Sequence, residues 1–377
     1  MKVADRVQET PPSGIRKFFE LAEEADDVIS LGVGEPDFSA PWPAREAAID
    51  ALERGQTSYT ANRGRADLRD GIAAHVARYD HEYDPEREIL VTAGASEAVD
   101  LAMRALVDPG DTVAVPQPSY ISYGPAATFA GADVLPVPTR AAEEFELTER
   151  ALREAGAADA DALIFCYPNN PTGAVMDADA LRPVAAFARE HDLTVFADEI
   201  YAALTYGGEH DSIATLPGMR ERTVVIGGFS KAYAMTGLRL GYALAPPEAI
   251  EAMNRIHQYT MLSAPTTAQF AGLEAIRSCD DAVADMRDAY DRRRRYVLAR
   301  FREMGLDCFE AEGAFYVFPE CPGDDEKFAE NLLTEEGVAV VPGSVFGEGG
   351  EGHLRVSYAT GMDELREATA RIERFLD

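Results

Sequence analysis

Cysteine is scarce in this sequence, and its positions argue against two kinds of stabilising site. Four cysteines occur among 377 residues, and no two of them form a Cys-x-x-Cys pair. Without that spacing no structural zinc site is indicated, and scattered cysteines do not indicate a disulfide framework. We therefore expect free thiols and a reducing, cytoplasmic location.

Long apolar runs are missing as well. No run approaches the 18 residues of a membrane span, and the N-terminal stretch MKVADRVQETPPSG lacks the apolar core of a signal peptide. We expect a soluble intracellular protein that does not bind membranes.

Motifs of three common enzyme classes are absent. The sequence has no G-x-x-x-x-G-K-[ST] motif for a nucleoside triphosphate and no G-x-G-x-x-G after a strand for a dinucleotide. Its six histidines form no H-E-x-x-H motif. We therefore expect no metal site.

Basic residues are few, and lysine is the rarer of the two types. The chain has 35 Lys and Arg against 66 Asp and Glu, a net charge of −31, and only four of the basic residues are lysines. Such a surface repels phosphate backbones, so no nucleic-acid partner is expected. Acidity with arginine in place of lysine resembles proteins of salt-loving archaea, in which salt screens the self-repulsion. An acidic protein from an ordinary salt environment is the alternative.

The middle of the chain predicts an α/β fold. Seven short apolar, β-branched runs alternate with amphipathic stretches of helical length, which indicates a mainly parallel sheet covered by helices on both faces. The runs are Glu88–Thr92, Thr112–Val115, Asp133–Val137, Ala162–Cys166, Leu193–Ala197, Thr223–Ile226 and Leu240–Ala243.

The pattern changes near residue 280, where a long charged helix is followed by strand-like and acidic segments. We expect a large α/β/α domain over 46–280 and a smaller α+β domain over 281–377, which the N-terminal segment 1–45 joins. Four consecutive arginines, Arg292–Arg295, stand among acidic residues in the long helix, and we expect them to form a solvated helix face.

Polar residues follow several of the predicted strands at their carboxyl ends, where open α/β sheets bind ligands. Ala95 and Ser96 begin a helix after the first run, and an Asn-Asn-Pro-Thr-Gly turn that includes Asn170 follows the fourth. Asp198 follows the fifth run, and Lys231 follows the sixth. A helix start offers N–H groups to an anion such as phosphate.

Together these residues suit pyridoxal phosphate, which has an aldehyde, a ring nitrogen that works best when protonated, and a dianionic phosphate. Lys231 is the only lysine placed after a buried-type strand, so it would supply the amine that captures the aldehyde. Asp198 would hold the ring nitrogen protonated.

From Leu31 to Tyr358 the sequence resembles class I, fold type I aminotransferases, in particular the archaeal aromatic and broad-specificity members. The segment PPSGIRKFFELAE at 11–23 also resembles those relatives. Nine motifs occur in the family's order: LGVGEPDF (31–38), SYT…LR (58–69), VTAGASEA (91–98), PSY (118–120), NNPTG (169–173), DEIY (198–201), FSKAYAMTGLRLGY (229–242), GAFYVFP (313–319) and LRVSYAT (354–360).

The resemblance implies a role for each residue of a cofactor site. It makes Lys231 the covalent attachment point and proton carrier, and Asp198 the partner of the ring nitrogen. It makes Tyr201 and Asn170 hydrogen-bond donors to the phenolate oxygen and Tyr120 the residue that stacks on the ring. It assigns the phosphate to Ala95, Ser96, Ser230 and Arg239. Tyr59 would reach the phosphate from the neighbouring subunit of a homodimer.

For the substrate, the resemblance implies that Arg355 binds the α-carboxylate, with Asn170 beside it and Gly34 letting the backbone close over it. Some dicarboxylate-specific relatives have a lysine at the position of Ser96, and many relatives have Trp at that of Leu238. We therefore expect transfer of the amino group of an aromatic or broad range of L-amino acids to a 2-oxo acid such as 2-oxoglutarate.

Three alternatives stay open. The enzyme could be an aspartate aminotransferase, or a carbon–sulfur β-lyase that uses the same fold and the same Lys231. A cofactor-binding domain of a transcription regulator would need an added DNA-binding unit, and only about 30 residues precede the first motif.

Overall fold

A seven-stranded sheet forms the centre of the computed structural model, which describes residues 1–16 and 27–377. Residues 17–23 of the segment that resembles archaeal relatives lie outside the described residues. The strands are β2 (Ile89–Thr92), β3 (Thr112–Gln117), β4 (Asp133–Pro138), β5 (Ala162–Cys166), β6 (Thr194–Asp198), β7 (Thr223–Gly228) and β8 (Gly241–Leu244). The order is β2-β8-β7-β6-β5-β3-β4, and only β8 runs against the other six. The prediction of a mainly parallel sheet from seven apolar runs is confirmed, and the strand ends shift by at most two residues.

The strands are buried on both faces because helices cover both. In β6, Phe196 packs into a different apolar cluster from its neighbours Val195 and Ala197, as expected when successive side chains point to opposite faces. The helices that surround this sheet are α3 (Trp42–Glu53), α4 (Ala66–Val76), α5 (Ala95–Leu106), α6 (Tyr123–Ala130), α7 (Glu149–Glu154), α8 (Ala178–Glu190), α9 (Pro247–Thr260) and α10 (Thr266–Ser278).

The last hundred residues build two smaller sheets, and the N-terminal segment joins one of them. A three-stranded antiparallel sheet has the order β11-β12-β9, and a two-stranded parallel sheet pairs β1 with β10. Their strands are β1 (Ile29–Ser30), β9 (Tyr316–Val317), β10 (Val338–Ala339), β11 (Val341–Pro342) and β12 (Leu354–Ser357). The domain boundaries expected at residues 45 and 280 stay a prediction.

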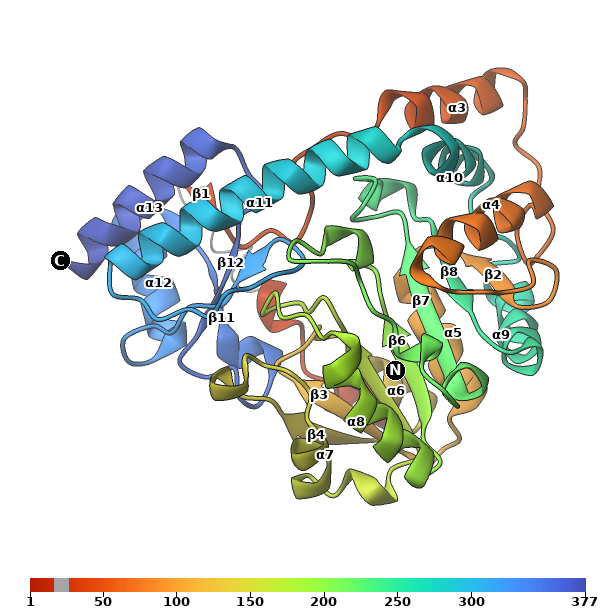
Figure 1. Ribbon diagram of the computed structural model, residues 1–377, viewed down its shortest axis with the longest axis horizontal. Coiled ribbons are helices and arrows are strands. Elements are labelled where there is room, and N and C mark those ends of the chain that lie inside the picture. Colours follow the sequence, from red (N-terminus) through yellow and green to blue (C-terminus); the bar gives the residue numbers. More distant parts are fainter. Residues whose placement is uncertain (17–26) are drawn as a thin grey trace.

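One long helix connects the two regions. In Figure 1, α11 (Asp280–Glu303, cyan) crosses the top of the molecule from α10 to α13 (Met362–Leu376). Two further α-helices of the described residues are α1 (Asp5–Glu9) near the N-terminus and α12 (Asp325–Glu336) beside α13. In the part of the chain that the structure describes, no helix is both long enough and apolar enough to cross a membrane.

The four arginines of α11 do not form a uniformly solvated face, so that prediction is wrong for two of them. Arg292 and Arg295 are exposed, whereas Arg293 and Arg294 are buried. Arg293 donates two hydrogen bonds to the carboxylate of Asp37, at 2.7 and 2.9 Å. The charges along the helix do not show which of its arginines are buried, because some of the carboxylates that bind Arg293 and Arg294 come from distant segments of the chain.

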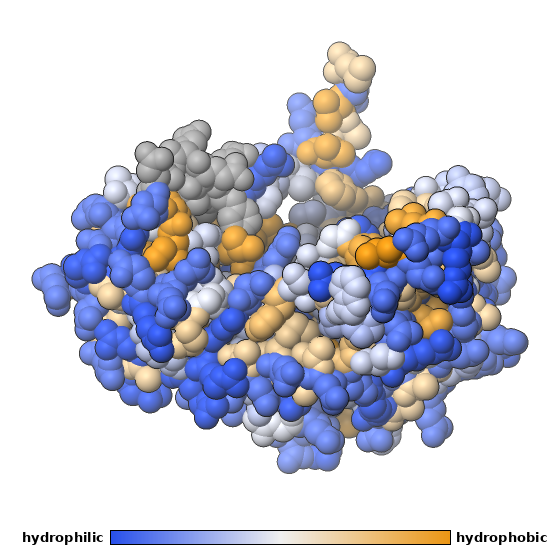
Figure 2. Space-filling view, turned by 90° about the horizontal axis from the view of Figure 1, so that it is seen from above, coloured by the Kyte–Doolittle hydropathy of each residue, from blue (hydrophilic) through white to orange (hydrophobic). Residues whose placement is uncertain are grey.

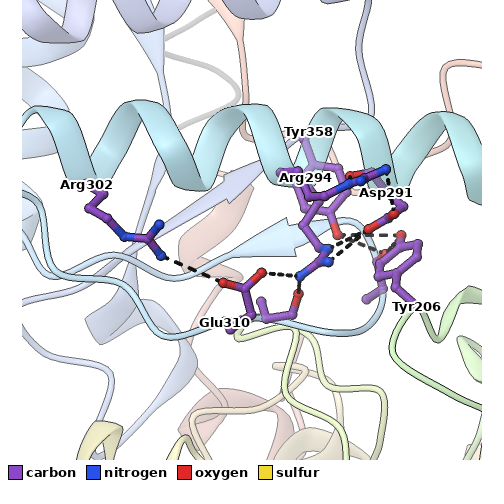
Figure 3. A network of polar contacts seen from close by, with 9 residues as sticks. Tyr206, Asp291, Arg294, Arg302, Glu310 and Tyr358 are labelled. Atoms are coloured by element: carbon purple, nitrogen blue, oxygen red, sulfur yellow. Dashed lines mark hydrogen bonds and ion pairs between the residues drawn. The ribbon is translucent and has the colours of Figure 1, made fainter.

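Arg294 stands at the centre of a polar network that fixes the loop before β9 (Figure 3). Its guanidinium contacts Asp291 and Glu310, and it also donates to the carbonyl oxygen of Ala311 at 3.0 Å. Next to it, the hydroxyl of Tyr358 donates to the carbonyl oxygen of Ala314 at 3.2 Å. This network therefore positions the loop that leads into Tyr316.

We expect Arg294→Ala to destabilise the protein by about 1–3 kcal/mol, because it leaves a buried carbonyl oxygen without this donor and takes one cation away from each of two carboxylates. Arg292→Ala on the same helix removes an exposed side chain and should change the free energy of unfolding by less than about 0.5 kcal/mol. Chemical denaturation of both variants measures the difference. Equal stabilities would show that the network does not hold the loop.

Candidate active site

A cavity of about 540 Å³ opens at the carboxyl ends of β5, β6 and β7. All residues predicted for the site line this cavity except Tyr59, so the structure brings together Gly34, Ala95, Ser96, Tyr120, Asn170, Asp198, Tyr201, Ser230, Lys231, Arg239 and Arg355. Tyr59 lies outside it with 78% of its surface exposed. One chain alone therefore assembles the whole predicted constellation apart from that tyrosine.

Lys231 comes shortly after β7 ends and offers an amine to the cavity. Its Nζ donates to the carbonyl oxygen of Gly34 at 2.6 Å. Burial lowers the pKa of Lys231 to about 8, although the nearby carboxylate of Glu35 acts to raise it, and the Arg355 guanidinium lowers it further. A substantial fraction of the amine is therefore neutral near pH 8, the form that attacks an aldehyde.

Asp198 ends β6 and is buried at the bottom of the cavity. One carboxylate oxygen accepts a hydrogen bond from the Tyr123 hydroxyl at 2.7 Å, and the other accepts from the Ile200 backbone N–H at 3.1 Å. Burial raises the pKa of Asp198 to about 6, and these two donors act against that rise. The carboxylate thus has donors on both oxygens but no cation bonded to it among the described residues.

Tyr123 was missed in the sequence although it lines the cavity and orients Asp198. The signal was available in the run Tyr120-Ile-Ser-Tyr123, where only the first tyrosine was assigned a role. Tyr120 is half-buried and meets the Tyr123 ring edge to face, with ring centres 5.5 Å apart. The two tyrosines therefore serve different parts of the site.

The start of α5 forms a cradle for an anion. Gly94 precedes the helix with φ of 87°, and a Cβ placed on it would lie 2.6 Å from Nη2 of Arg239. A Cβ on Gly241 would lie 2.5 Å from the backbone nitrogen of Ala95. Both positions therefore require glycine, which brings the arginine close to the first N–H groups of the helix. Helix N–H groups beside a guanidinium suit a phosphate group.

Arg355 is a buried cation that also lines the cavity. Its two terminal nitrogens donate to the side-chain oxygen of Asn170 at 3.0 Å and to the carbonyl oxygen of Gly32 at 2.6 Å. Within the described ranges, no carboxylate pairs with this guanidinium, and its buried Nε has no hydrogen-bond partner. Since a buried charge requires a counter-charge, the arrangement suits the carboxylate of a small ligand.

Tyr316 is a second residue that sequence reasoning missed. Its hydroxyl lies 3.0 Å from that of Tyr201, and its ring lies against the Arg355 guanidinium, 4.8 Å from the ring centre. A Cβ on Gly34 would come within 2.8 Å of the Tyr316 hydroxyl, so glycine is required there. The motif GAFYVFP indicated a strand but not which side chain faces the cavity.

The burial of Asp198 predicts a pH-dependent stability difference in the cofactor-free protein. Folding raises the pKa of the Asp198 carboxyl from the ordinary value of 3.8 to about 6, so the group costs nothing below the lower value. The destabilisation grows as the pH rises between the two values and is complete above the folded pKa. Asp198→Asn should therefore be more stable than the wild type at pH 8, on the order of 1–3 kcal/mol, and about equally stable at pH 4. Thermal unfolding at both pH values measures this. If the stability gained by Asp198→Asn over the wild type is smaller at pH 8 than at pH 4, the expectation is contradicted.

Comparison with known proteins identifies the family of the chain. The family model "Aminotransferase class I and II" matches residues 26–372. YugH, an aminotransferase-family protein of Bacillus subtilis (strain 168), is 50% identical over 99% of this chain and 98% of its own. The aspartate aminotransferase of Pyrococcus abyssi is 43% identical over 100% and 98%. The structure of the aromatic aminotransferase of Pyrococcus horikoshii aligns with a TM-score of 0.91 at 43% identity, over 95% of this chain and 98% of that one. The chain is therefore a transaminase that belongs to the class I and II aminotransferase family.

Proposed function

We propose that the cavity binds pyridoxal phosphate through Lys231 and transfers the amino group of an aromatic or broad range of L-amino acids to a 2-oxo acid such as 2-oxoglutarate. The observation that supports this most directly is that one cavity holds a partly neutral amine, a buried carboxylate and a buried guanidinium without a counter-ion. These are the three groups that the aldehyde, the ring nitrogen and the substrate carboxylate require.

Bound pyridoxal phosphate supplies an aldehyde that condenses with amines and a ring that accepts an electron pair from the substrate Cα. In our proposal Lys231 would hold the cofactor at its aldehyde carbon, and the same amine would carry the proton at the substrate Cα. Asp198, which Tyr123 orients, holds a proton on the ring nitrogen. Ala95, Ser96, Ser230 and Arg239 hold the phosphate at the start of α5.

Three further residues orient the ring. Tyr201 and Asn170 donate to the phenolate oxygen, and Tyr120 lies against the ring face. Asn170 is suited to this because its side-chain oxygen already accepts from Arg355, which leaves its amide N–H groups free to donate. The same contact joins the cofactor's position to that of the substrate carboxylate, which Arg355 binds beneath Gly34.

The preference for aromatic and other neutral side chains is supported by the charges around the cavity. Its cations among the described residues are Lys231, Arg239 and Arg355, and our proposal uses each of them already. Ser96 is uncharged, and the carboxylate of Glu35 also faces the cavity. A second substrate carboxylate would therefore need a cation from another chain.

The homodimer is supported by apolar side chains on one exposed region. Exposed large hydrophobic residues gather on α3 and at the end of α9, and Figure 2 shows orange patches on the face seen from above, toward the side where α3 lies in Figure 1. They are Trp42, Ile49 and Leu52 on α3, Tyr259, Met261 and Leu262 at and after the end of α9, and Tyr59. Hydrogen bonds from Asn62 to Leu262 and from Thr266 to Ser58 join the two loops. We propose a second copy of this chain as the occupant, since it would bring Tyr59 to the neighbouring site.

Lys231→Ala tests the proposed function. The variant should bind pyridoxal phosphate without the absorption of the covalently attached form, and its turnover should fall by about 10³-fold or more, because capture and proton transfer use the same amine. Lys327→Ala removes an exposed lysine and should leave both properties unchanged. Full activity in Lys231→Ala would exclude this mechanism, and release of pyruvate or ammonia without any 2-oxo acid would favour the β-lyase.

A substrate panel tests the side-chain preference. We expect phenylalanine and tyrosine to show a higher kcat/KM than aspartate with 2-oxoglutarate as acceptor, because burying a ring is favourable by about 1.5–3 kcal/mol whereas an unpaired carboxylate is costly. Alanine, which shares the amine and α-carboxylate but lacks a ring, serves as the reference for side-chain burial. Aspartate favoured more than about tenfold over both aromatics, a difference of about 1.4 kcal/mol, would establish the aspartate alternative instead.

Subunit mixing tests whether Tyr59 acts in the neighbouring site. Tyr59→Phe alone should weaken pyridoxal phosphate binding by about 3–10-fold through loss of one hydrogen bond to phosphate. A hybrid dimer of Tyr59→Phe and Lys231→Ala chains contains one site with both native residues, so it should regain wild-type cofactor affinity and turnover at that site. If Tyr59 acts within its own chain, the hybrid keeps the weakened affinity.

A further inference from the structure

A buried charged cluster lies behind Asp198, on the side of the sheet away from the main cavity. Glu199 directly follows Asp198, and adjacent side chains at a strand end point to opposite faces. Asp198 lines the 540 Å³ cavity, whereas Glu199 lines a separate small cavity together with Gly227, Gly228 and Tyr242. The proposed mechanism gives Glu199 no part, although the motif DEIY contains it.

Two histidines face this one carboxylate. Nε2 of His210 lies 3.1 Å and Nε2 of His81 lies 3.5 Å from the same oxygen of Glu199, and the hydroxyl of Ser212 donates to the other oxygen. The side chains of Glu199, His81 and His210 are only 9%, 3% and 5% exposed. Burial alone would raise the pKa of Glu199, but the two histidines, His210 first, lower it to about 2.

The cluster is surrounded by groups whose ionisation Glu199 influences. Its negative charge acts to raise the pKa of Asp198, and it does the same for the other titratable groups around it. These are Tyr79 and Tyr83 from the segment after α4, Cys166 at the end of β5 and Tyr242 on β8, while His75 lines the same small cavity. Glu199 is the only carboxylate of the described residues to which His81 and His210 are paired.

We infer that Glu199 is a positioning residue that, balanced by His81 and His210, sets the charge behind Asp198 and so tunes how strongly Asp198 holds a proton on the cofactor ring. This inference rests on the proposed function, since it assumes that Asp198 faces the ring nitrogen. Its physical basis is that the two carboxylates belong to adjacent residues, and the charge of Glu199 acts to raise the pKa of Asp198. A nearby like charge strengthens a carboxylate's hold on a proton, and a positive charge beside it cancels the effect.

Two variants should shift the same property in opposite directions. Glu199→Gln removes the negative charge behind Asp198, so the ring should hold its proton less strongly. His210→Gln removes a counter-charge and leaves Glu199 uncompensated, so the ring should hold its proton more strongly. A loss of packing alone does not produce opposite shifts, and this distinguishes tuning from a structural role.

The readout is the absorption of the bound cofactor in the loaded enzyme without substrate, titrated between pH 5 and pH 10. A charge change near Asp198 alters the pH at which the bound cofactor beside it gains or loses its proton. We expect the midpoint to move down by about 0.5–1 pH unit in Glu199→Gln and up by a similar amount in His210→Gln, with the double variant between them. His191→Gln is the matched control, since His191 also faces a glutamate but lies at the end of α8 away from the cluster.

Midpoints unchanged from the wild type, or moved in the same direction in both variants, would overturn the inference. If His210→Gln fails to fold, His81→Gln replaces it and should move the midpoint up. Ser212→Ala removes an uncharged donor to Glu199 and serves as a further control that should leave the midpoint within about 0.3 pH unit. If the wild-type protein never develops the absorption of attached cofactor, the proposed function itself is refuted. If the variants do bind the cofactor but titrate with the midpoint of the wild type, only the inference about Glu199 is refuted.

Discussion

Two carbonyl groups in one short segment hold the two cations nearest the middle of the cavity. The carbonyl oxygen of Gly32 accepts from Arg355, and that of Gly34 accepts from Lys231, each at 2.6 Å. Neither cation forms an ion pair with a carboxylate among the described residues, so these neutral acceptors keep both side chains in place without neutralising them. The cavity thereby keeps its positive charges for ligands, because a carbonyl dipole satisfies an N–H group but leaves most of the charge uncompensated.

The position of that segment depends on contacts from both regions of the protein. The Leu31 backbone N–H donates to the carbonyl oxygen of Ala339, and the Leu31 carbonyl oxygen accepts from the Ser357 N–H. The carboxylate of Asp37 accepts two hydrogen bonds from Arg293 of α11. A second loop, which the Arg294 network fixes, brings Tyr316 against the same segment. The long helix therefore determines, through two adjacent buried arginines, where two walls of the cavity lie.

The large sheet and part of the candidate site could be predicted from local signals in the sequence, whereas the roles of residues such as Tyr120, Arg239 and Arg355 came from the resemblance to a family. A strand buried on both faces appears as a short β-branched apolar run, and polar residues at its carboxyl end mark the ligand edge. Lys231 and Asp198 were identifiable on these grounds. Tyr123, Tyr316 and the cluster around Glu199 were not, because their roles depend on contacts between segments far apart in the chain. Arg293 and Arg294 show the same limit, since their charges alone do not reveal which face of α11 is covered.

The pairing of β1 with β10 has a consequence for the order in which this protein is built during synthesis. Ile29 is paired with Val338, 338 − 29 = 309 positions later, whereas all seven strands of the large sheet lie between residues 89 and 244. A ribosome releases the chain from its N-terminus, so the large sheet has every strand available long before β10 emerges. Until then the segment with Gly32 and Gly34 has no strand to pair with, and Arg355 has not been made. The wall that carries Gly32 and Gly34 therefore forms beside Lys231 and Arg355 only after β10 has been made.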